Sequence, residues 1–339
     1  MGATYRAVML QRKGGLDALE RVELPVRRPG PGEVRLRVTV CGVGGTDLVM
    51  RTGYYPYAPP LPFVPGYEVV GVVEELGDGG ATPRVGQRVA ALTVTGGYAE
   101  QLVLPAAELV PVPDGLPDDA VCAVILNYVT AYQAAHRAGQ VARGQTALVL
   151  GASGGVGTAL LEVLREAGVT AIGAASTAKH ELVRSLGATP VDGRGDVAAA
   201  VRALHPGGVD VAFDPLGGGY TGACRRALRR GGRLVALGFT STVVPGGGTR
   251  LLALLGGVAQ LYALSPLTGR RTTFYGITRD YRKDPRPFRE DLQQVLALLA
   301  AGRIAPRIDA QLPLDEAREA QALLERGAVR GKVLLLPQQ

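Results

Sequence analysis

The segment TALVLGASGGVGTALLEVLREAG, residues 146–168, constrains the fold of this chain more than any other. A short apolar run is followed by a glycine-rich loop and then by apolar residues at helical spacing, which predicts a strand, a tight turn and a helix. Strands and helices continue to alternate as far as the apolar run RLVALGF at 233–239. This alternation predicts a doubly wound parallel sheet with helices on both faces, because each helix carries the chain back to the edge where the next strand begins.

The N-terminal third of the chain has a different pattern. Before Asp118 the sequence holds short alternating or apolar runs cut by Pro and Gly, such as EVRLRVTV and EVVGVVEEL, which predict a β-rich, barrel-like domain. The C-terminal part adds a strand in TTFYGIT, a helix in PFREDLQQVLALLAAG and a final strand in GKVLLLP. With 339 residues the chain is too long for a single hydrophobic core, so we expect two domains.

Composition and charge exclude several classes of function. The 37 Lys and Arg residues are interleaved with 30 Asp and Glu, and the one dense basic patch, at 222–233, suits the solvated face and last turn of a helix, so nucleic-acid binding is not expected. There is no signal-peptide pattern and no run of about 18 apolar residues, so we expect a cytoplasmic protein without a transmembrane segment. Cys41, Cys122 and Cys224 have no CxxC spacing, which indicates a reducing compartment.

The glycine-rich loop has the context of a dinucleotide-binding fingerprint. Glycines after a strand let the backbone approach a pyrophosphate, and the N-terminus of the next helix offers unpaired N–H groups and a partial positive charge. Many strand-to-helix turns need glycine for steric reasons alone, so the evidence is the position of this loop at the head of a strand–helix series. The residues expected to hold the cofactor here are Gly151, Ser153, Gly154, Gly155 and Val156.

The end of the second strand indicates which dinucleotide binds. NAD-binding sheets place an acid there for the ribose 2′-hydroxyl, whereas this chain has AASTAKH, with no acid. Ser176, Lys179 and, after the third strand, Arg194 are expected to contact a 2′-phosphate, so NADPH is the predicted cofactor. The alternative is that Lys179 is a solvated residue in the first turn of a helix. Gly238 and Phe239, at the end of RLVALGF, complete the expected cofactor-binding set.

Motifs along essentially the whole chain resemble those of the medium-chain dehydrogenase/reductase superfamily. They are CGVGGTD, PGYEVVGVVEELG, VGQRVAAL, GGYAE, NYVTAYQAA, GASGGVG, DPLGG and GKVLLLP. The resemblance implies a GroES-like, β-rich catalytic domain of residues 1–124 and 282–339. It also implies a Rossmann NADP-binding domain of residues 125–281, which agrees with the sheet expected from the alternation of strands and helices.

The chain departs from the zinc-dependent members of that superfamily. Those members carry Cys at the position of Gly44, often His at that of Gly45, and a ligand His at that of Tyr67. The four-cysteine lobe of a structural zinc is also missing, because residues 85–115 contain no cysteine. We therefore expect no metal. Cys41 matches the small residue ahead of the ligand position, and we interpret it as a buried strand-end cysteine rather than a nucleophile.

A metal-free member of the superfamily looks like the quinone oxidoreductase branch. Within that branch, NYVTAYQAA, ASTAKHELVRSLGA and DPLGG are similar to the vesicle amine transport protein subgroup. The resemblance implies NADPH-dependent reduction of quinones or α,β-unsaturated carbonyls. Hydride addition to such substrates leaves an anion that hydrogen bonds can stabilise without a metal. We expect a small-molecule substrate and a homodimer.

The same motif matches supply the expected catalytic residues. Tyr55, in TGYYPYAP, matches a tyrosine of related enoyl reductases and is expected to donate a proton or a hydrogen bond to the substrate carbonyl; the alternative is an aromatic at the rim of the site. Thr130 matches a threonine beside the nicotinamide, and Asp47 matches the acid that closes the first motif. Glu68 is expected to be a structural hydrogen-bonding residue. Gly44 departs from the branch, which often has Asn there to hold the ribose or nicotinamide.

Two further readings of the function stay open. One is a biosynthetic enzyme that uses the scaffold for an unusual reductive, cyclising or isomerising step. The other is a non-catalytic nucleotide-binding partner protein. The apolar segment 244–269 is expected either to wall a substrate pocket or to form part of a dimer contact.

Overall fold

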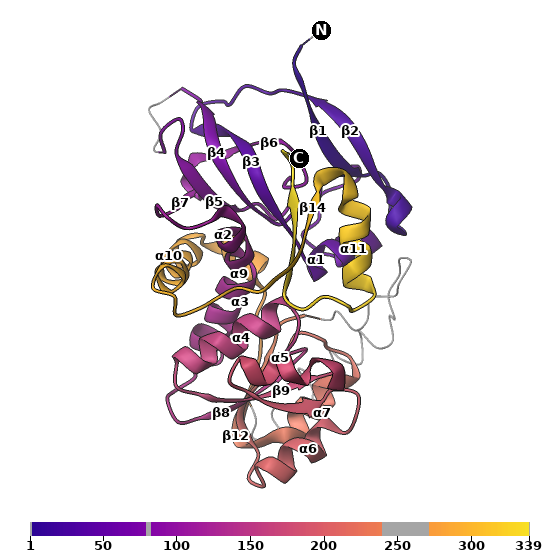
Figure 1. The fold of residues 1–339 in the computed structure, drawn as a ribbon, viewed down its shortest axis with the longest axis vertical. Helices are drawn as coiled ribbons and strands as arrows, with labels where there is room; N and C mark the ends of the chain where they lie inside the picture. The colour runs from indigo at the N-terminus through magenta and orange to yellow at the C-terminus, as the bar shows by residue number, and fades with distance from the viewer. Residues whose placement is uncertain (1, 79–82, 239–270, 339) are drawn as a thin grey trace. The chain divides into compact units, whose positions relative to one another are not determined.

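The computed structural model describes residues 2–78, 83–238 and 271–338. The described residues form two compact units, coloured by residue number in Figure 1. Among the described residues, the first unit contains those up to Leu126 and from Tyr281 onward, and the second contains those from Asn127 to Gly238 and from Arg271 to Asp280. The predicted contact of Phe239 with the cofactor and the predicted role of segment 244–269 fall outside the described residues.

The first unit is built on a mostly antiparallel sheet with the strand order β14-β15-β3-β4-β5-β7, in which β6 also pairs with β3. Its strands are β3 (Glu33–Val43), β4 (Glu68–Leu76), β5 (Arg88–Leu92), β6 (Gln101–Pro105), β7 (Val110–Pro111), β14 (Ile308–Pro313) and β15 (Lys332–Leu336). In β3 every second side chain is fully buried, as the alternation in EVRLRVTV predicts; Val34, Leu36 and Val38 belong to the core. The β-rich first domain predicted from the sequence is confirmed.

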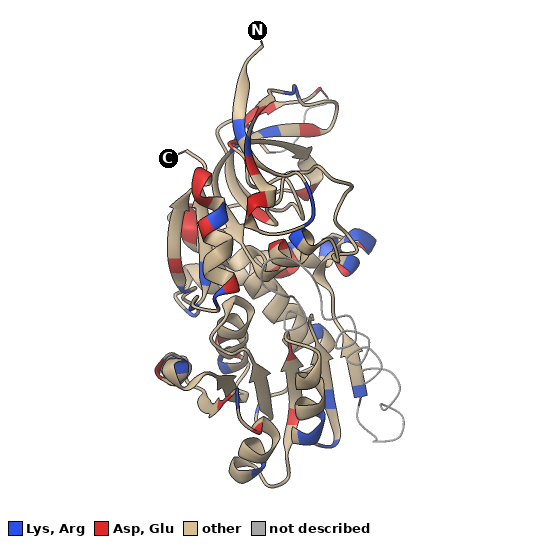
Figure 2. Cartoon of the chain, turned by 90° about the vertical axis from the view of Figure 1, so that its right-hand side faces the viewer, with Lys and Arg blue, Asp and Glu red and all other residues tan. Residues whose placement is uncertain are grey.

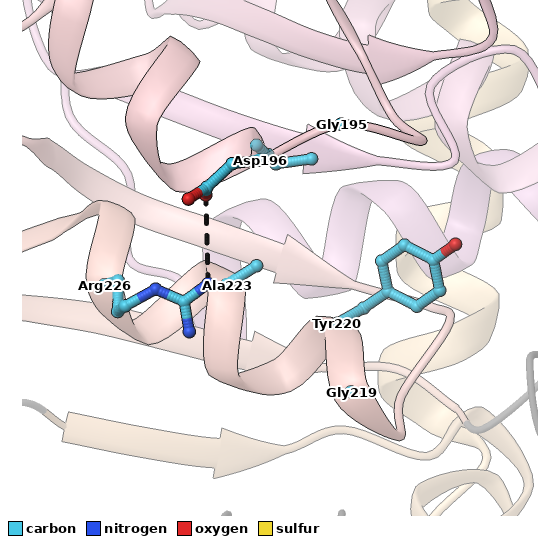
Figure 3. A pocket seen from close by; sticks show the side chains of 7 residues that line it. Gly195, Asp196, Gly219, Tyr220, Ala223 and Arg226 are labelled. Carbon is cyan, nitrogen blue, oxygen red and sulfur yellow. Dashed lines mark ion pairs between the residues drawn. The ribbon is translucent and has the colours of Figure 1, made fainter.

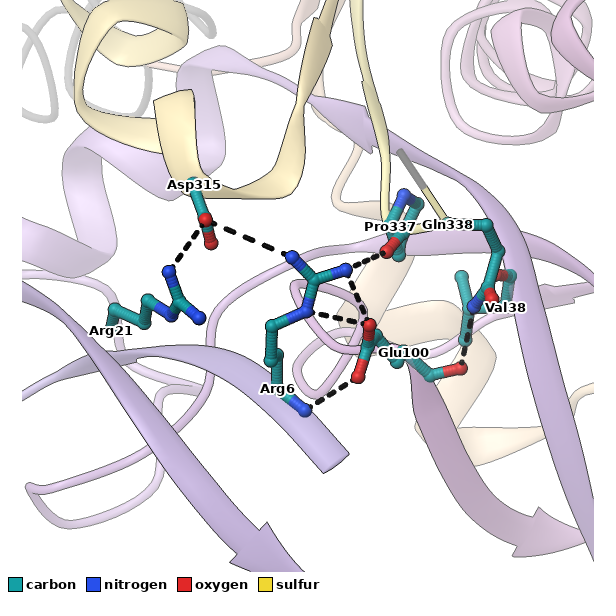
Figure 4. Close-up of polar contacts among 7 residues, drawn as sticks. All are labelled: Arg6, Arg21, Val38, Glu100, Asp315, Pro337 and Gln338. Atoms are coloured by element: carbon teal, nitrogen blue, oxygen red, sulfur yellow. Dashed lines mark hydrogen bonds and ion pairs between the residues drawn. The ribbon is translucent and has the colours of Figure 1, made fainter. Parts of the chain in front are cut away.

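A hairpin of β1 (Thr4–Leu10) and β2 (Leu19–Pro25) is fastened to the C-terminal end of the chain by Arg6 (Figure 4). Its guanidinium Nε donates to Glu100 at 2.7 Å, and another guanidinium nitrogen donates to the carbonyl oxygen of Pro337 at 3.3 Å. Asp315 lies 3.8 Å from the same guanidinium and pairs with Arg21 at 2.8 Å. One half-buried arginine therefore joins segments that are more than 300 residues apart.

The first unit also contains helices, of which α1 and α11 are joined by a buried arginine. They are α1 (Gly45–Thr52), α2 (Asp118–Ile125), α10 (Arg286–Ala300) and α11 (Ala317–Glu325), with short 3-10 turns at Leu16–Ala18, Ala106–Glu108 and Leu314–Glu316. Arg51 in α1 is only 1% exposed, and it donates to Gln321 in α11 at 2.8 Å and to the carbonyl oxygen of Gly14 at 3.0 Å. These contacts fix α1, the helix that carries Asp47.

The second unit contains a six-stranded, wholly parallel sheet among the described residues, with the order β10-β9-β8-β11-β12-β13. Its strands are β8 (Thr146–Leu150), β9 (Thr170–Ala175), β10 (Thr189–Asp192), β11 (Val209–Asp214), β12 (Leu228–Ala236) and β13 (Arg271–Phe274). The chain starts at β8, adds β9 and β10 on one side, then returns to add β11, β12 and β13 on the other. The doubly wound sheet predicted from the sequence is confirmed. The order in which strands are added reverses between β8 and β11, while all strands stay parallel.

Helices cover both faces of this sheet. They are α3 (Asn127–Gln133), a π-helical turn (Ala134–Ala138), α4 (Gly155–Glu166), a 3-10 turn (Thr177–Lys179), α5 (His180–Ser185), α6 (Val197–Leu204) and α7 (Gly219–Ala227), while α9 (Ile277–Lys283) leads back to the first unit. Leu148 and Leu150 of β8 share one apolar cluster with Val201 of α6 and Cys224 of α7. The strand side chains that alternate with them lie on the opposite face, where α4 packs against β8 and β9. Right-handed crossovers place the helices that precede and follow the reversal on opposite faces of the sheet.

Two sequence predictions about helices are wrong in detail. The segment DDAVCAVILNYVTAYQAAHRAG, residues 118–139, predicts one long helix, but the helix is divided at Leu126 into α2 and α3. The basic run at 222–233 was expected to be one helix, but α7 ends at Ala227 and β12 begins at once. A local run of arginines does not reveal this change, because the strand forms by pairing with β11, which lies earlier in the chain.

Positively and negatively charged residues are interspersed along the chain in both units (Figure 2). Two arginines of β12 bind groups within the second unit. Arg229 pairs with Asp210 at 2.6 Å, and Arg233 donates to the carbonyl oxygen of Gly139 at 2.9 Å. Within the described part of the chain, none of the helices has the length and apolar character needed to cross a bilayer.

Candidate functional site

The glycine-rich loop forms the turn from β8 into α4. Gly151 has a φ of +59°, a conformation that favours glycine. A Cβ at Gly157 would overlap the carbonyl oxygen of Gly151 and lie 2.8 Å from the Cα of Ala152, so the helix can approach the strand only if residue 157 lacks a side chain. Gly154 is the N-cap of α4 and offers no side-chain cap, so the N–H groups of the first helical turn are open to a ligand.

The loop after β8 lies against the loop after β11, at the point where the sheet reverses. A Cβ at Gly151 would be 3.5 Å from the side chain of Leu216. Asp214, fully buried at the end of β11, holds this second loop: it accepts the N–H groups of Leu216 at 3.0 Å and Gly217 at 2.8 Å, and the hydroxyl of Thr221 at 2.8 Å. Burial raises the pKa of Asp214. The DPLGG motif alone did not predict this anchoring role of its aspartate.

Gly238, predicted to contact the cofactor, follows β12 at the same edge. A Cβ on it would be 3.3 Å from the carbonyl oxygen of Pro215. The N–H group of Leu237 donates to the carbonyl oxygen of Asp214 at 2.8 Å. The structure therefore brings Gly151 and Gly238 to opposite sides of one turn at the carboxyl edge of the sheet.

Ser176, Lys179 and Arg194 follow two neighbouring strands at the same edge. Ala175 of β9 is in register with Asp192 of β10, and the N–H of the residue after Asp192 donates to the carbonyl oxygen of Ala175 at 2.8 Å. Ser176 begins the 3-10 turn that ends at Lys179, whose N–H donates to the carbonyl oxygen of Ser176 at 2.8 Å. Ser176 and Lys179 are half-buried, and Arg194 is exposed. The three predicted residues thus lie at adjacent strand ends.

A pocket of about 490 Å³ lies at the start of α6 and α7 (Figure 3). It is lined by Gly195, Asp196, Val197, Gly219, Tyr220, Ala223 and Arg226. The Asp196 carboxylate caps α6 by accepting the N–H groups of Ala198 and Ala199 at 3.1 and 3.2 Å, and it lies 3.8 Å from Arg226. The ring of Tyr220 lies to the side of that ion pair. Sequence reasoning did not single out this pocket, since no motif marks it.

In the first unit the CGVGGTD motif forms the end of β3 and the start of α1. The Asp47 carboxylate accepts the N–H of Gly44 at 2.8 Å and that of Gly66 at 3.2 Å, and its side chain is 1% exposed. Burial, with the nearby Glu68 carboxylate, raises the pKa of Asp47 to about 7. A Cβ at Gly44 would meet nothing closer than 3.8 Å, so packing does not require glycine there.

Beside Asp47 lies a buried ion pair between Glu68 of β4 and Lys332 of β15. The two side chains are 0% and 2% exposed, and their charged atoms are in direct contact. Burial raises the pKa of Glu68, against the opposing effect of Lys332. Burial alone would lower the pKa of Lys332, but the Glu68 carboxylate raises it overall. A Cβ at Gly42 would overlap Glu68 and come within 2.7 Å of the Lys332 stem, so this position needs glycine.

Tyr55 and Tyr67 form a hydrogen-bonded pair. Their hydroxyl oxygens are 2.5 Å apart, and their rings meet edge to face with centroids 6.2 Å apart. Tyr67 is 1% exposed, whereas Tyr55 is half-buried. On its other side Tyr55 meets the ring of Tyr57, which lies under the guanidinium of Arg282 at 5.1 Å. Sequence reasoning named Tyr55 and noted Tyr67 in a ligand position, but it did not predict that the two phenols bond to each other.

The remaining candidates are placed as follows. Thr130 is 7% exposed in α3 and belongs to the second unit, whereas Asp47 and Tyr55 belong to the first. Cys41 is fully buried, and burial raises the pKa of its thiol, as expected of a small hydrophobic residue. The described residues contain no group of three or more His, Cys, Asp or Glu side chains arranged to hold a metal ion.

Known proteins with similar sequences match this chain over nearly its whole length. Residues 30–114 match the family model of the alcohol dehydrogenase GroES-like domain, and residues 186–335 match a model described as zinc-binding dehydrogenase. The rat synaptic vesicle membrane protein VAT-1 homolog is 33% identical, over 98% of this chain and 84% of that protein. Human quinone oxidoreductase is 28% identical, over 98% of this chain and 97% of its own.

The chain belongs to the zinc-independent quinone oxidoreductase branch of the medium-chain dehydrogenase/reductase superfamily. A mycobacterial member solved as a complex with NADPH is 27% identical, superimposes with a TM-score of 0.86, and is matched over 98% of this chain and 100% of its own. Members of this superfamily are oxidoreductases with a nicotinamide-dinucleotide-binding fold, and the second unit has that fold. The match to a zinc-binding model covers residues 186–335, which exclude positions 44, 45 and 67.

Proposed function

We propose that this protein is an NADPH-dependent, metal-free reductase that transfers a hydride to a quinone or an α,β-unsaturated carbonyl compound. The observation that carries the proposal is the set of groups at the carboxyl ends of β9 and β10. Ser176, Lys179 and Arg194 gather there, and no acid follows β9 within its turn. A hydroxyl and two cations suit a phosphate on the ribose, whereas the 2′-hydroxyl of NAD favours an Asp or Glu.

The start of α4 fits the pyrophosphate of such a cofactor. Gly154 leaves the helix without a side-chain cap, and Gly151 and Gly157 let the backbone fold tightly behind it. The N–H groups of Gly155, Val156 and Gly157, in the first turn, would bind the phosphate oxygens with help from the helix dipole. Ser153, which is 8% exposed, would line the same turn. When bound, NADPH supplies the hydride.

The first unit supplies hydrogen bonding to the substrate. Tyr55 is the half-buried phenol in the position of a proton donor, and reduction of a conjugated substrate places negative charge on its oxygen. The Asp47 carboxylate is committed to two backbone amides, so we assign it a positioning role. It fixes the turn at Gly44 against Gly66, which directly precedes Tyr67. Thr130 would lie beside the nicotinamide, as the motif match implies.

The test is NADPH oxidation by purified protein with a panel of quinones and enones. Steady turnover is expected with at least one class. Tyr55→Phe is expected to lower enone turnover about 10²- to 10⁴-fold, and to lower quinone turnover less, because the reduced quinone anion is already stabilised. NADPH affinity is expected to stay nearly constant. Equal small effects on both substrates would demote Tyr55 to a rim residue. No turnover with any quinone or enone, together with NADPH binding, would favour the non-catalytic partner protein.

A further inference from the structure

We infer that Tyr67 is a positioning residue that holds the Tyr55 phenol and polarises it, so that the two tyrosines act on the substrate oxygen as one proton-donating unit. This inference rests on the proposed function. It concerns the residue that occupies the position where zinc-dependent relatives carry a ligand histidine. The hydroxyl of Tyr67 at this position lies 2.5 Å from that of Tyr55, within hydrogen-bond distance.

Tyr67 is the fixed member of the pair. It directly precedes β4, and its carbonyl oxygen accepts the N–H groups of Thr93 at 2.9 Å and Val94 at 3.1 Å. Its side chain is 1% exposed. Tyr55, in contrast, lies in a loop between α1 and β4, outside any helix or strand. The hydrogen bond and the edge-to-face ring contact therefore restrain the position of Tyr55, although it lies in a loop.

Burial decides which of the two phenols loses its proton first, although either hydroxyl can donate while both are neutral. Burial, and then the Tyr55 phenol, raise the pKa of Tyr67 well above its ordinary value, and the Glu68 and Asp47 carboxylates raise it further. When the pair gives up a proton, Tyr67 is therefore the member that keeps its own, and it then donates a hydrogen bond to the oxygen of Tyr55. In that arrangement the hydroxyl hydrogen of Tyr55 is the one transferred to a substrate oxygen.

The same geometry favours proton donation by Tyr55. As the substrate oxygen becomes negative, the O–H bond of Tyr55 breaks and a new O–H bond forms on the substrate, which gives an enol or a hydroquinone. The electron pair of the broken bond stays on the Tyr55 oxygen, where the Tyr67 hydroxyl stabilises it by a charge-assisted hydrogen bond. Water then returns a proton to Tyr55, and the enol ketonises in solution.

Tyr67→Phe keeps the ring and removes only the donor. We expect it to lower kcat on an enone about tenfold to a hundredfold, with KM for the enone and NADPH affinity nearly unchanged. Because both residues act as one unit, the Tyr55→Phe/Tyr67→Phe double variant is expected to be no slower than Tyr55→Phe alone. Tyr54→Phe is the matched control, since Tyr54 lies in the same loop but is 54% exposed, and it is expected to behave as the wild type.

A second readout does not depend on turnover. The chain has 12 tyrosines and no tryptophan, so tyrosinate absorbance can be followed without tryptophan background. The difference between the titrations of wild type and Tyr55→Phe reports Tyr55, and the same difference in the Tyr67→Phe background is expected to move to higher pH, because the donor to the phenolate is gone. An unshifted titration, or unchanged enone kcat in Tyr67→Phe, would overturn the inference.

The two proposals fail in distinguishable ways. If no enone or quinone is reduced, the proposed function fails, and the titration still decides whether Tyr67 polarises Tyr55. If turnover is robust in Tyr67→Phe, the function stands and the pairing fails. Should Tyr67→Phe not fold, Tyr55 is compared with the exposed Tyr54 in the wild-type background. A pKa for Tyr55 at or below that of Tyr54 supports the inference, and a higher pKa overturns it.

Discussion

The two units prepare their sites by opposite means. In the second unit the groups proposed to bind the ligand are backbone amides and half-buried or exposed side chains, and the turn that presents them is made possible by Gly151 and Gly157. In the first unit the polar groups are buried side chains bonded to one another or to the backbone, as with Asp47, Glu68 and Lys332. In the second unit the polar groups are available to a ligand, whereas in the first unit these three charged side chains are bonded to other groups of the protein.

Two helices within the second unit show the same contrast on a smaller scale. Asp196 caps α6 by accepting two N–H groups, so that helix satisfies its own N-terminus. Gly154 gives α4 no side-chain cap. Because a capped helix has less to offer an anion, α4 rather than α6 is the helix suited to a pyrophosphate. The comparison predicts that substitutions of Asp47, Glu68 and Lys332 in the first unit act mainly on stability, and that those of the exposed or half-buried cations in the second unit act mainly on binding.

The largest effect on stability is expected from Lys332→Met. It leaves the fully buried Glu68 carboxylate without its cation and should lower the free energy of unfolding by about 3 to 5 kcal/mol, measured by urea denaturation. The Lys332→Met/Glu68→Gln double variant replaces both charges by neutral side chains of similar size and is expected to recover most of the loss. A single variant within about 1 kcal/mol of the wild type would show that the first unit does not depend on this pair.

The next effect belongs to the second unit. Lys179→Ala should weaken NADPH binding by roughly 1.5 to 3 kcal/mol, about tenfold to a hundredfold, and leave NADH binding and the free energy of unfolding nearly unchanged. Titration of both dinucleotides measures this directly. Lys283→Ala is the matched control, because Lys283 is an exposed lysine in α9. Equal loss for both dinucleotides, or no loss for NADPH, would return Lys179 to the role of a solvated helix residue.

Asp47 predicts a pH-dependent effect in the first unit that is spread over several pH units. Its pKa is about 7 in the folded protein, against roughly 4 in an unfolded chain, so between these values the folded state holds a proton that the unfolded state has released. The stability from this group is complete below about pH 4 and falls by roughly 1.4 kcal/mol per pH unit as the pH rises toward 7. Glu68 and Lys332 face the same region and titrate as well, so the slope must be compared with that of a variant.

Asp47→Asn is that variant. It does not titrate, and its amide nitrogen cannot accept an N–H from the backbone, so it is expected to be less stable overall but to lack this part of the slope. Urea denaturation at several pH values measures both quantities. Identical slopes in Asp47→Asn and wild type would mean that Asp47 is ionised throughout the range.

The sequence predicted the parts of the molecule that depend on local pattern. Apolar periodicity and glycine placement identified most strands of both sheets and the β8–α4 turn, because side chains of neighbouring residues decide them. The short β7 and the strand β14 were not predicted. The pairs that define the first unit lie far apart in sequence, with a separation of 264 positions from Glu68 to Lys332. No periodicity encodes such a pair. The start of β12 at Leu228, five residues before the apolar run that begins at Arg233, was missed for the same reason, since β12 is fixed by its partner β11.

The comparison also explains which predicted site residues were easiest to find. Gly151 and Gly238 follow strands of one parallel sheet, so the topology alone brings them to one edge. Tyr55 lies in a loop, and a motif match indicated its identity but not its partner. Asp214 was quoted in DPLGG without a role, although a buried acid at a strand end is often an anchor for the following turn.

The smallest effect is expected from removing metal. Zinc in proteins is held by thiolates, imidazoles and carboxylates, and none of these side chains stands at positions 44, 45 and 67 of the first unit. Gly44 and Gly45 carry no donor, and the Tyr67 phenol bonds to Tyr55. The Asp47 carboxylate binds two amides and that of Glu68 binds Lys332. Chelation followed by dialysis is therefore expected to change neither the thermal midpoint nor NADPH oxidation, and elemental analysis should find far less than one zinc per chain. A value near one, or a midpoint that falls on chelation and returns with zinc, would mean that the first unit holds an open ligand set after all, and the contrast between the two units would be lost.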